Sequence, residues 1–437
     1  MKQTVDRVRR FFTFFIMAAA MILLTSPAPV VADAHKPITL NLMAAVKKHP
    51  EIGAMLTESI KAAKKINPDP KTNPVQSLSG YYDFIDRASE LIPQDVLQNP
   101  KDLTRDQILQ SICYFHFLVD QPLPELRGKG LFRNTIQFYA PFSEWLRGFA
   151  NVWGAFLDTE ASWTAATYKQ FYDDPSFGLQ KGWYEPSSNW NTFNRFFSRY
   201  LKSPEVRPIA SSNNPAVVVS PADSVPQGQW AIDGKSNIQV DGGLKVKLAT
   251  FYSIKDLLGP DSKYTSAFAY GVLTHTFLNV NDYHRYHFAV GGIVKEKKII
   301  AQNVALEVAW DPANGRYVPI DSTGWQFSQT RGYVIVDTGE YGFVALIPMG
   351  MAQVSSVNFE DNVTVGAERR KGDMLGTFLF GGSDFVMLFQ EKAGLVITAP
   401  RETPSAQKSD AGPEHGNPAY KHILMGEAYG VMNRKAQ

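Results

Sequence analysis

Apolar residues recur every three or four positions through the first half of the chain. This spacing is typical of amphipathic helices, and it is clearest over residues 41–66, 102–119 and 141–172. Asp102 is suited to cap the second of these helices, because its side-chain oxygen can accept a hydrogen bond from the first turn. The third stretch is dense in Trp, Phe and Tyr, for which we expect packing between helices, with a membrane-facing surface as the alternative.

The pattern changes at about residue 215. From there, short apolar runs are separated by Gly, Pro and Asn, which predicts β-strands joined by turns. The predicted strands cover residues 216–220, 238–247, 268–280, 304–310, 332–337, 341–348, 375–380, 383–389 and 394–398. A polar stretch over 401–418 is expected to be an exposed loop. The sequence therefore predicts an α+β protein, with a helical N-terminal half followed by a β-rich, barrel-like domain.

Residues 1–34 have the layout of a secretory signal peptide. Four basic residues lie among the first ten, an apolar run covers 11–24, prolines follow at 27 and 29, and Ala32-Asp33-Ala34 supplies small residues for cleavage. The apolar run is shorter than the ~20 residues needed to span a bilayer. We therefore expect export to the periplasm or to the periplasmic face of the inner membrane, with a short anchor or a buried helix as alternatives.

Composition excludes several classes of function. The net charge is only +2 and no long Lys/Arg run occurs, so the concentrated basic face of a nucleic-acid-binding protein is not expected. Cys113 is the only cysteine, which excludes an intramolecular disulfide framework and a metal site built from cysteines.

Polar residues interrupt the apolar strands at three places. Asp223 ends the run 217–224, His284 and His287 follow the apolar stretch that ends at Val280, and Ser383 follows two glycines between two apolar runs. Each has an ordinary explanation. An aspartate after Ser-Pro-Ala is typical of a turn, and Gly-Gly-Ser is typical of a bulge. Two histidines without a third ligand at diagnostic spacing do not predict a metal site.

Taken together, these residues could support nucleophilic chemistry, because a serine needs a base and the base needs an orienting group. The nucleophile elbow G-x-S-x-G is absent, since Phe385 stands where its second glycine would be. A serine after glycine has another option, which is attack on the carbonyl of its own peptide bond. Gly382 has no Cβ, so its carbonyl is approachable and a strained turn is tolerated. The resulting ester can undergo β-elimination, and hydrolysis then leaves an N-terminal pyruvoyl group.

The motifs, in this order, resemble the phosphatidylserine decarboxylase family over roughly residues 190–400. The similar segments are 191–199 with Arg207-Pro208, 220–223, 282–287, 345–350 and 371–378, with a weaker similarity at 425–427. The longer N-terminal half is similar to the helical extension of fungal and bacterial relatives that include aromatic amino-acid decarboxylases.

The resemblance implies a role for each candidate residue. Ser383 would be the processing nucleophile and the source of a covalent pyruvoyl cofactor, with cleavage between Gly382 and Ser383. His287 would be the base, Asp223 would orient its imidazole, and His284 would donate a proton during decarboxylation. No metal is implied.

The resemblance also implies an organisation and a substrate. A helical domain over 35–190 would precede a catalytic domain over 191–437, and cleavage would divide the mature chain into a β chain, 35–382, and an α chain, 383–437. The expected substrate is phosphatidylserine, with peripheral membrane association and a homodimer as further expectations. The alternatives are a decarboxylase of a free, aromatic amino acid and an unprocessed binding protein on the same fold.

Two residues depart from the family pattern. Ser224 stands where glycine is common, and Asp384 stands where a small hydroxyl residue usually follows the serine. A carboxylate beside the forming oxyanion should disfavour self-cleavage, unless Asp384 is protonated or points away.

Overall fold

The computed structural model describes residues 35–94, 106–238, 253–320, 325–351, 357–402 and 419–434. The predicted signal peptide, Asp102 and nearly all of the predicted strand 238–247 and loop 401–418 lie outside the described residues. Among the described residues, no helix is both long enough and apolar enough to cross a bilayer.

Helices dominate the N-terminal half, as predicted. They are α1 (Pro37–Lys48), α2 (Pro50–Ile66), α3 (Leu78–Ala88), α4 (Asp106–Phe117), α5 (Phe142–Leu157), α6 (Ala165–Asp173) and α7 (Phe193–Phe197), while α8 (Ile254–Leu258) belongs to the β-rich half. The single helix predicted over 41–66 is two helices, because Pro50 fits the first turn of a helix but not its interior. The aromatic stretch 141–172 is likewise divided, with α5 ending at Leu157 and α6 starting at Ala165.

Short antiparallel strands form the C-terminal half. They are β1 (Val217–Val219), β2 (Val225–Ala231), β3 (Val272–Leu278), β4 (Arg285–His287), β5 (Gly292–Ile300), β6 (Glu307–Asp311), β7 (Arg316–Ile320), β8 (Arg331–Asp337), β9 (Phe343–Met351), β10 (Val357–Phe359), β11 (Glu368–Arg369), β12 (Met374–Phe378), β13 (Gly382–Phe389), β14 (Leu395–Ile397) and β15 (Ala428–Met432). The predicted helical half and β-rich half are both confirmed.

The largest sheet has seven strands in the order β11-β5-β8-β9-β13-β3-β2. It is open within the described part of the chain, with β11 and β2 at its edges, so the predicted barrel-like closure is not observed. Two three-stranded sheets, β10-β12-β4 and β1-β15-β14, and the hairpin β6-β7 are the other sheets of the described residues.

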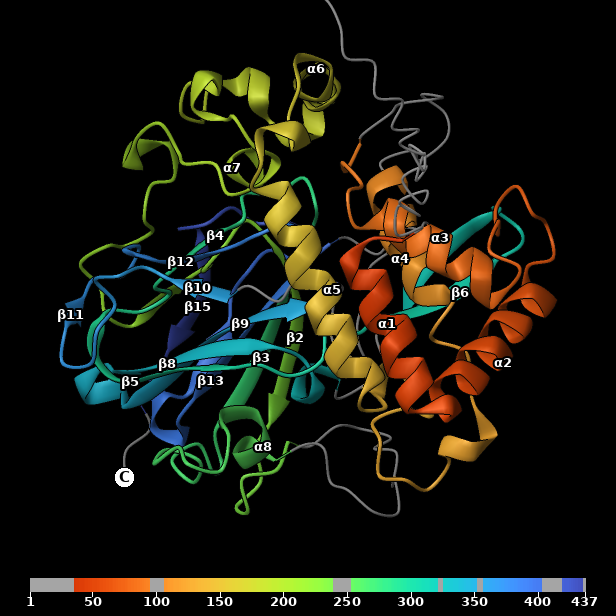
Figure 1. Ribbon diagram of the computed structural model, residues 1–437. Coiled ribbons are helices and arrows are strands. Elements are labelled where there is room, and N and C mark those ends of the chain that lie inside the picture. The colour runs from red at the N-terminus through yellow and green to blue at the C-terminus, as the bar shows by residue number, and fades with distance from the viewer. Residues whose placement is uncertain are drawn as a thin grey trace, which may run out of the picture.

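The helical half packs onto the β-rich half. Helices α1–α4 gather at one side of the molecule, where β6 lies beside α4 (Figure 1). Tyr317 of β7 contacts the rings of Tyr114 and Phe117 of α4, at centroid distances of 5.5 and 4.8 Å. Trp153 of α5 contacts Phe380, which lies just before β13, at 5.3 Å. One hydrophobic core therefore joins the helices to the segment that leads into Ser383.

Candidate active site

Ser383 is the second residue of β13, a strand in the interior of the large sheet. It pairs with Gly350 on β9 and with Leu278 on β3. Its side chain is fully buried, and its hydroxyl makes no hydrogen bond to another described residue. The chain enters β13 through Gly381, whose φ of +147° is a conformation that residues with side chains rarely adopt. The predicted cleavage bond, Gly382–Ser383, therefore lies between a glycine-dependent turn and a buried strand.

Asp384 points away from Ser383. Successive side chains of a strand point to opposite faces of its sheet. Ser383 shares its face with Phe385, whereas Asp384 shares the opposite face with Val386 and Leu388, and these two sets belong to different hydrophobic clusters. The sheet thus meets one of the two conditions under which Asp384 was expected to tolerate self-cleavage.

His287 is buried at the end of β4 in a single tautomer. Its backbone N–H donates to the carbonyl of Pro221 at 2.7 Å, and its Nδ1 lies 2.8 Å from the carbonyl oxygen of Gly372. Because a carbonyl only accepts, Nδ1 carries the proton and Nε2 keeps a lone pair, which the Tyr283 hydroxyl contacts at 3.3 Å. Burial lowers the pKa of His287 to about 4. The imidazole is therefore neutral near pH 7, as a base must be.

Asp223 is held by Arg207 rather than by His287. Its oxygens accept hydrogen bonds from Arg207 Nε at 3.1 Å and Nη2 at 2.7 Å, and from the backbone N–H of Met425 at 2.8 Å. No hydrogen bond joins Asp223 to His287, so the expected direct orientation of the imidazole is absent and Gly372 performs it instead. The physical reason is that a guanidinium offers two parallel donors that match a carboxylate. Asp223 still acts on His287 at a distance, because its charge opposes the lowering of the pKa by burial.

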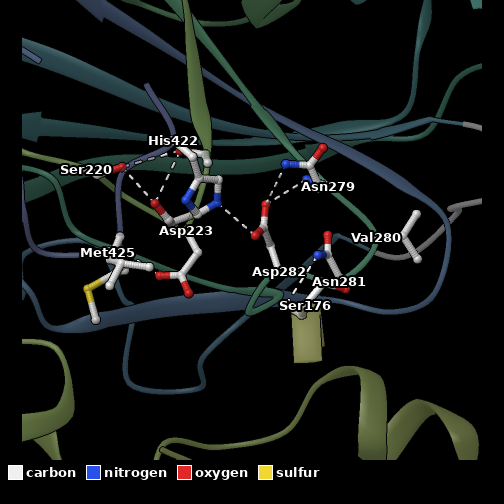
Figure 2. A network of polar contacts seen from close by, with 12 residues as sticks. Ser176, Ser220, Asp223, Asn279, Val280, Asn281, Asp282, His422 and Met425 are labelled. Carbon is white, nitrogen blue, oxygen red and sulfur yellow. Dashed lines mark hydrogen bonds and ion pairs between the residues drawn. The ribbon is translucent and has the colours of Figure 1, made fainter. Parts of the chain in front are cut away.

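A second carboxylate, Asp282, lies beside this pair. Figure 2 shows His422 reaching toward Asp282, with Nε2 2.8 Å from Oδ1, while the backbone N–H of Asn279 donates to Oδ2 at 2.7 Å. Burial opposes protonation of His422, but its hydrogen bond to Asp282 and the charges of Asp282 and Asp223 raise its pKa. The network ties the C-terminal segment to the two loops that carry Asp223 and His284.

His284 is buried against an aromatic ring. It stacks on Phe197 of α7 at a centroid distance of 3.9 Å, and its Nε2 lies 3.2 Å from the carbonyl oxygen of Val280. Nε2 therefore carries the proton, and the buried Nδ1 has no hydrogen-bond partner among the described residues. Burial, together with the charge of Arg199, lowers the pKa of His284 to about 3. His284 is thus a neutral imidazole, and its predicted role as a proton donor stays a prediction.

Sequence reasoning missed three contributors to the site. Arg207 stood within a quoted motif and Tyr283 stood between the two histidines, so position alone could have indicated both. His422 had no local signal. The segment before residue 190 also reaches the site, because Trp183 lies under the Arg207 guanidinium at 4.4 Å and the ring of Tyr184 stacks on that of Tyr283.

Known proteins share these motifs. The sequence profile described as phosphatidylserine decarboxylase matches residues 193–417, just over half of the chain. The phosphatidylserine decarboxylase proenzyme of Fusobacterium nucleatum is 30% identical over 232 residues, which cover 52% of this chain and 69% of that protein. The proenzyme of Alcanivorax borkumensis is 29% identical over 290 residues, 62% of this chain and 91% of that protein. Phosphatidylserine decarboxylase proenzyme 2 of rice is 31% identical over 210 residues, 48% of this chain but only 31% of that longer protein.

The match covers every residue of the site described above except Trp183, Tyr184, His422 and Met425. It begins at α7, which supplies Phe197, and includes the turn and strand that carry Ser383. The chain belongs to the phosphatidylserine decarboxylase family of carboxy-lyases.

Proposed function

We propose that the chain is a proenzyme that cleaves itself between Gly382 and Ser383, and that the cleaved form converts phosphatidylserine to phosphatidylethanolamine. The observation that carries this proposal is the Ser383 hydroxyl, which is buried after the Gly381 turn with no hydrogen-bond partner among the described residues. Buried polar atoms are normally hydrogen-bonded. A buried hydroxyl that no other described group engages, next to the carbonyl of a glycine, is available to attack that carbonyl.

The cleavage is balanced without an external oxidant or reductant. Ser383 Oγ attacks the carbonyl carbon of Gly382 and His287 takes the hydroxyl proton. The C–N bond then breaks as the ester forms, and His287 returns the proton to the departing nitrogen, which becomes an amine. Elimination then removes the Cα proton of residue 383 and breaks the Cβ–Oγ bond, which leaves a carboxylate on Gly382 and dehydroalanine at position 383. Hydrolysis consumes one water, releases one ammonia and leaves a pyruvoyl group at the start of the α chain.

The surroundings of Ser383 suit this group. Its cross-strand neighbour is Leu278, and the next side chain on its own face of β13 is Phe385. A pyruvoyl ketone supplies an electron sink for an amine substrate that loses carbon dioxide. An apolar face favours loss of a charged carboxylate as a neutral gas. His284, a neutral imidazole held by Phe197 and Val280, is the side chain we assign to proton transfer at the reacting carbon.

We further infer that the enzyme acts at the periplasmic face of the inner membrane as a peripheral protein. The signal-peptide pattern of residues 1–34 and a lipid substrate support this location. Decarboxylation of a free aromatic amino acid is the second candidate, and it is not favoured by the names of the three relatives given above, which are all phosphatidylserine decarboxylase proenzymes.

Intact-mass measurement of the purified protein tests the cleavage. A 55-residue fragment that starts at position 383 is expected. Ser383→Ala should stay intact, while Ser328→Ala, which changes another buried serine, should cleave normally. A wild-type chain that remains whole would refute the proposal.

Release of carbon dioxide tests the substrate. Cleaved enzyme should release it from phosphatidylserine liposomes and not from free tryptophan, tyrosine or serine. Release from tryptophan or tyrosine alone would establish the second candidate instead.

A further inference from the structure

Asp384 has a partner on the far side of the sheet. On β3, His275 lies opposite Val386, which places it diagonally across from Asp384 on the same face. Asp384 Oδ2 lies 3.1 Å from His275 Nε2, and the two side chains are 1% and 2% exposed. The residue that departs from the family pattern is therefore matched by a histidine on the neighbouring strand.

Burial makes this partner necessary. A carboxylate in an apolar environment is costly unless it is paired with a cation or neutralised by a proton. The described neighbours of Asp384 on this face include the apolar Val386, Leu388 and Met349. Arg331, two strands away on the same face, directs its hydrogen bonds to main-chain carbonyls and to the side-chain amide of Gln302.

A histidine and an aspartate that share one proton carry no net charge. That proton gives either an imidazolium with a carboxylate or an imidazole with a carboxylic acid, two states of the same total charge, whereas without it the pair is one unit negative. This matters because the carbonyl oxygen of Gly382, two residues from Asp384, becomes negative when Ser383 attacks. An uncompensated carboxylate at that distance would oppose the attack.

We propose that His275 is a positioning residue for self-cleavage. It holds the Asp384 carboxyl on the face opposite to Ser383 and cancels its charge, so that negative charge can develop on the Gly382 carbonyl. His275 does not touch the reacting atoms and acts through Asp384. The inference rests on the proposed self-cleavage and explains how this chain tolerates an acidic residue after the serine.

The test is the rate at which newly synthesised precursor is converted to its two fragments in cell-free translation, followed on gels. His275→Ala should slow conversion about 10- to 30-fold. This is the effect of one unit charge about 10 Å away, the reach of two strand residues at about 3.3 Å each plus a side chain, at an effective dielectric constant of about 20. Asp384→Asn should convert at the wild-type rate or faster. The double variant His275→Ala/Asp384→Asn should regain most of the lost rate, because no charge remains to be cancelled.

Two controls separate charge from folding. His35→Ala removes the partner of Asp86 at a His–Asp contact of 2.7 Å in the helical half, and it should convert at the wild-type rate. Thermal unfolding of each variant in an uncleavable Ser383→Ala background reports whether the precursor folds. If His275→Ala alone fails to fold, the double variant decides, since recovery of folding and cleavage by Asn supports a role in charge compensation.

Three results would contradict the inference. A folded His275→Ala precursor that converts at the wild-type rate overturns it, and so does a double variant as slow as the single one. A double variant that does not fold would show that His275 acts by packing. If the wild-type chain is never cleaved, the proposed function itself fails. That outcome can be told apart from the first two results, because each of those compares a variant with a wild-type chain that does cleave.

Discussion

Replacing Arg207 by alanine should destabilise the precursor strongly, because it leaves the Asp223 carboxylate buried and unpaired. Arg207 donates two hydrogen bonds to Asp223, and the side chains of the pair are 1% and 4% exposed. Its guanidinium also stacks on Trp183 at 4.4 Å. The backbone N–H of Met425 would remain as a donor to Asp223, but it brings no positive charge.

The magnitude follows from the burial of both charges. Removing one partner of a buried ion pair costs about 3–5 kcal/mol, far more than the ~0–1 kcal/mol of an exposed pair. For a chain of this size, whose urea m-value is about 3 kcal/mol/M or more, the midpoint of unfolding should fall by roughly 1 M. Removing both charges in Arg207→Ala/Asp223→Ala should cost less than the sum of the single changes, because the unpaired carboxylate is then gone.

Urea unfolding in the Ser383→Ala background measures this effect on a single uncleaved chain. Arg195→Ala on α7 is the matched control, since its side chain is exposed and the change should stay within about 0.5 kcal/mol. Equal midpoints for Arg207→Ala and Arg195→Ala would show that the buried pair does not hold the Asp223 loop in place. The same result would remove the reason given for the missing contact between Asp223 and His287.

Three further outcomes are expected. Burial lowers the pKa of His287 to about 4. The rate of self-cleavage in short incubations should therefore stay constant from pH 7 to about pH 5 and fall to half near pH 4. A midpoint near the ordinary histidine pKa of 6.5 would contradict the described environment. Gly381→Ala should slow cleavage and lower the free energy of unfolding by about 1–3 kcal/mol, measured by calorimetry, because Gly381 has a φ of +147°. Gly154→Ala within α5 is the control and should not destabilise the fold. Equal effects of the two changes would argue against a strained turn. Burial lowers the pKa values of His116, His284 and His287 to about 4, 3 and 4, so the unfolded state binds more protons at these three sites below pH 6.5. Burial raises the pKa of Asp120 to about 7, which offsets one of these protons but not all three. The thermal midpoint should therefore fall as pH decreases from 6.5 toward 4, and a flat profile would refute this linkage.

Local pattern predicted the elements whose side chains repeat in a simple way. The strand expected over 383–389 is β13, and the change from helices to strands near residue 215 is observed. The pattern missed β5, although that strand pairs along its length with β8. Its centre is Lys295-Glu296-Lys297-Lys298, and such a charged run hides the alternation of a strand that has one solvent-facing side.

The candidate site was predicted as a set of residues but not as a set of contacts. Ser383, His287, His284 and Asp223 are all buried, as residues of a shielded site must be. The partner of Asp223 is Arg207, which lies in irregular structure, and the neighbouring Arg195 and Arg199 were equally available by sequence. Long-range pairing of charges depends on how loops fold over one another, and no periodicity encodes that.

The position of the cleavage bond has a consequence for the two chains that it would produce. Gly382–Ser383 lies at the start of β13, so cutting it leaves the ladders from Asp384 to Phe389 intact on both sides, with β9 and with β3. The α chain also supplies β15, which lies between β1 and β14, and its Met425 N–H and His422 hold Asp223 and Asp282 of the β chain. Separating the chains would therefore require breaking an interior strand out of the large sheet and opening a second sheet. A self-cleaving protein must lose one covalent bond without losing its site, and placing that bond at the end of a strand whose other residues stay paired meets this requirement.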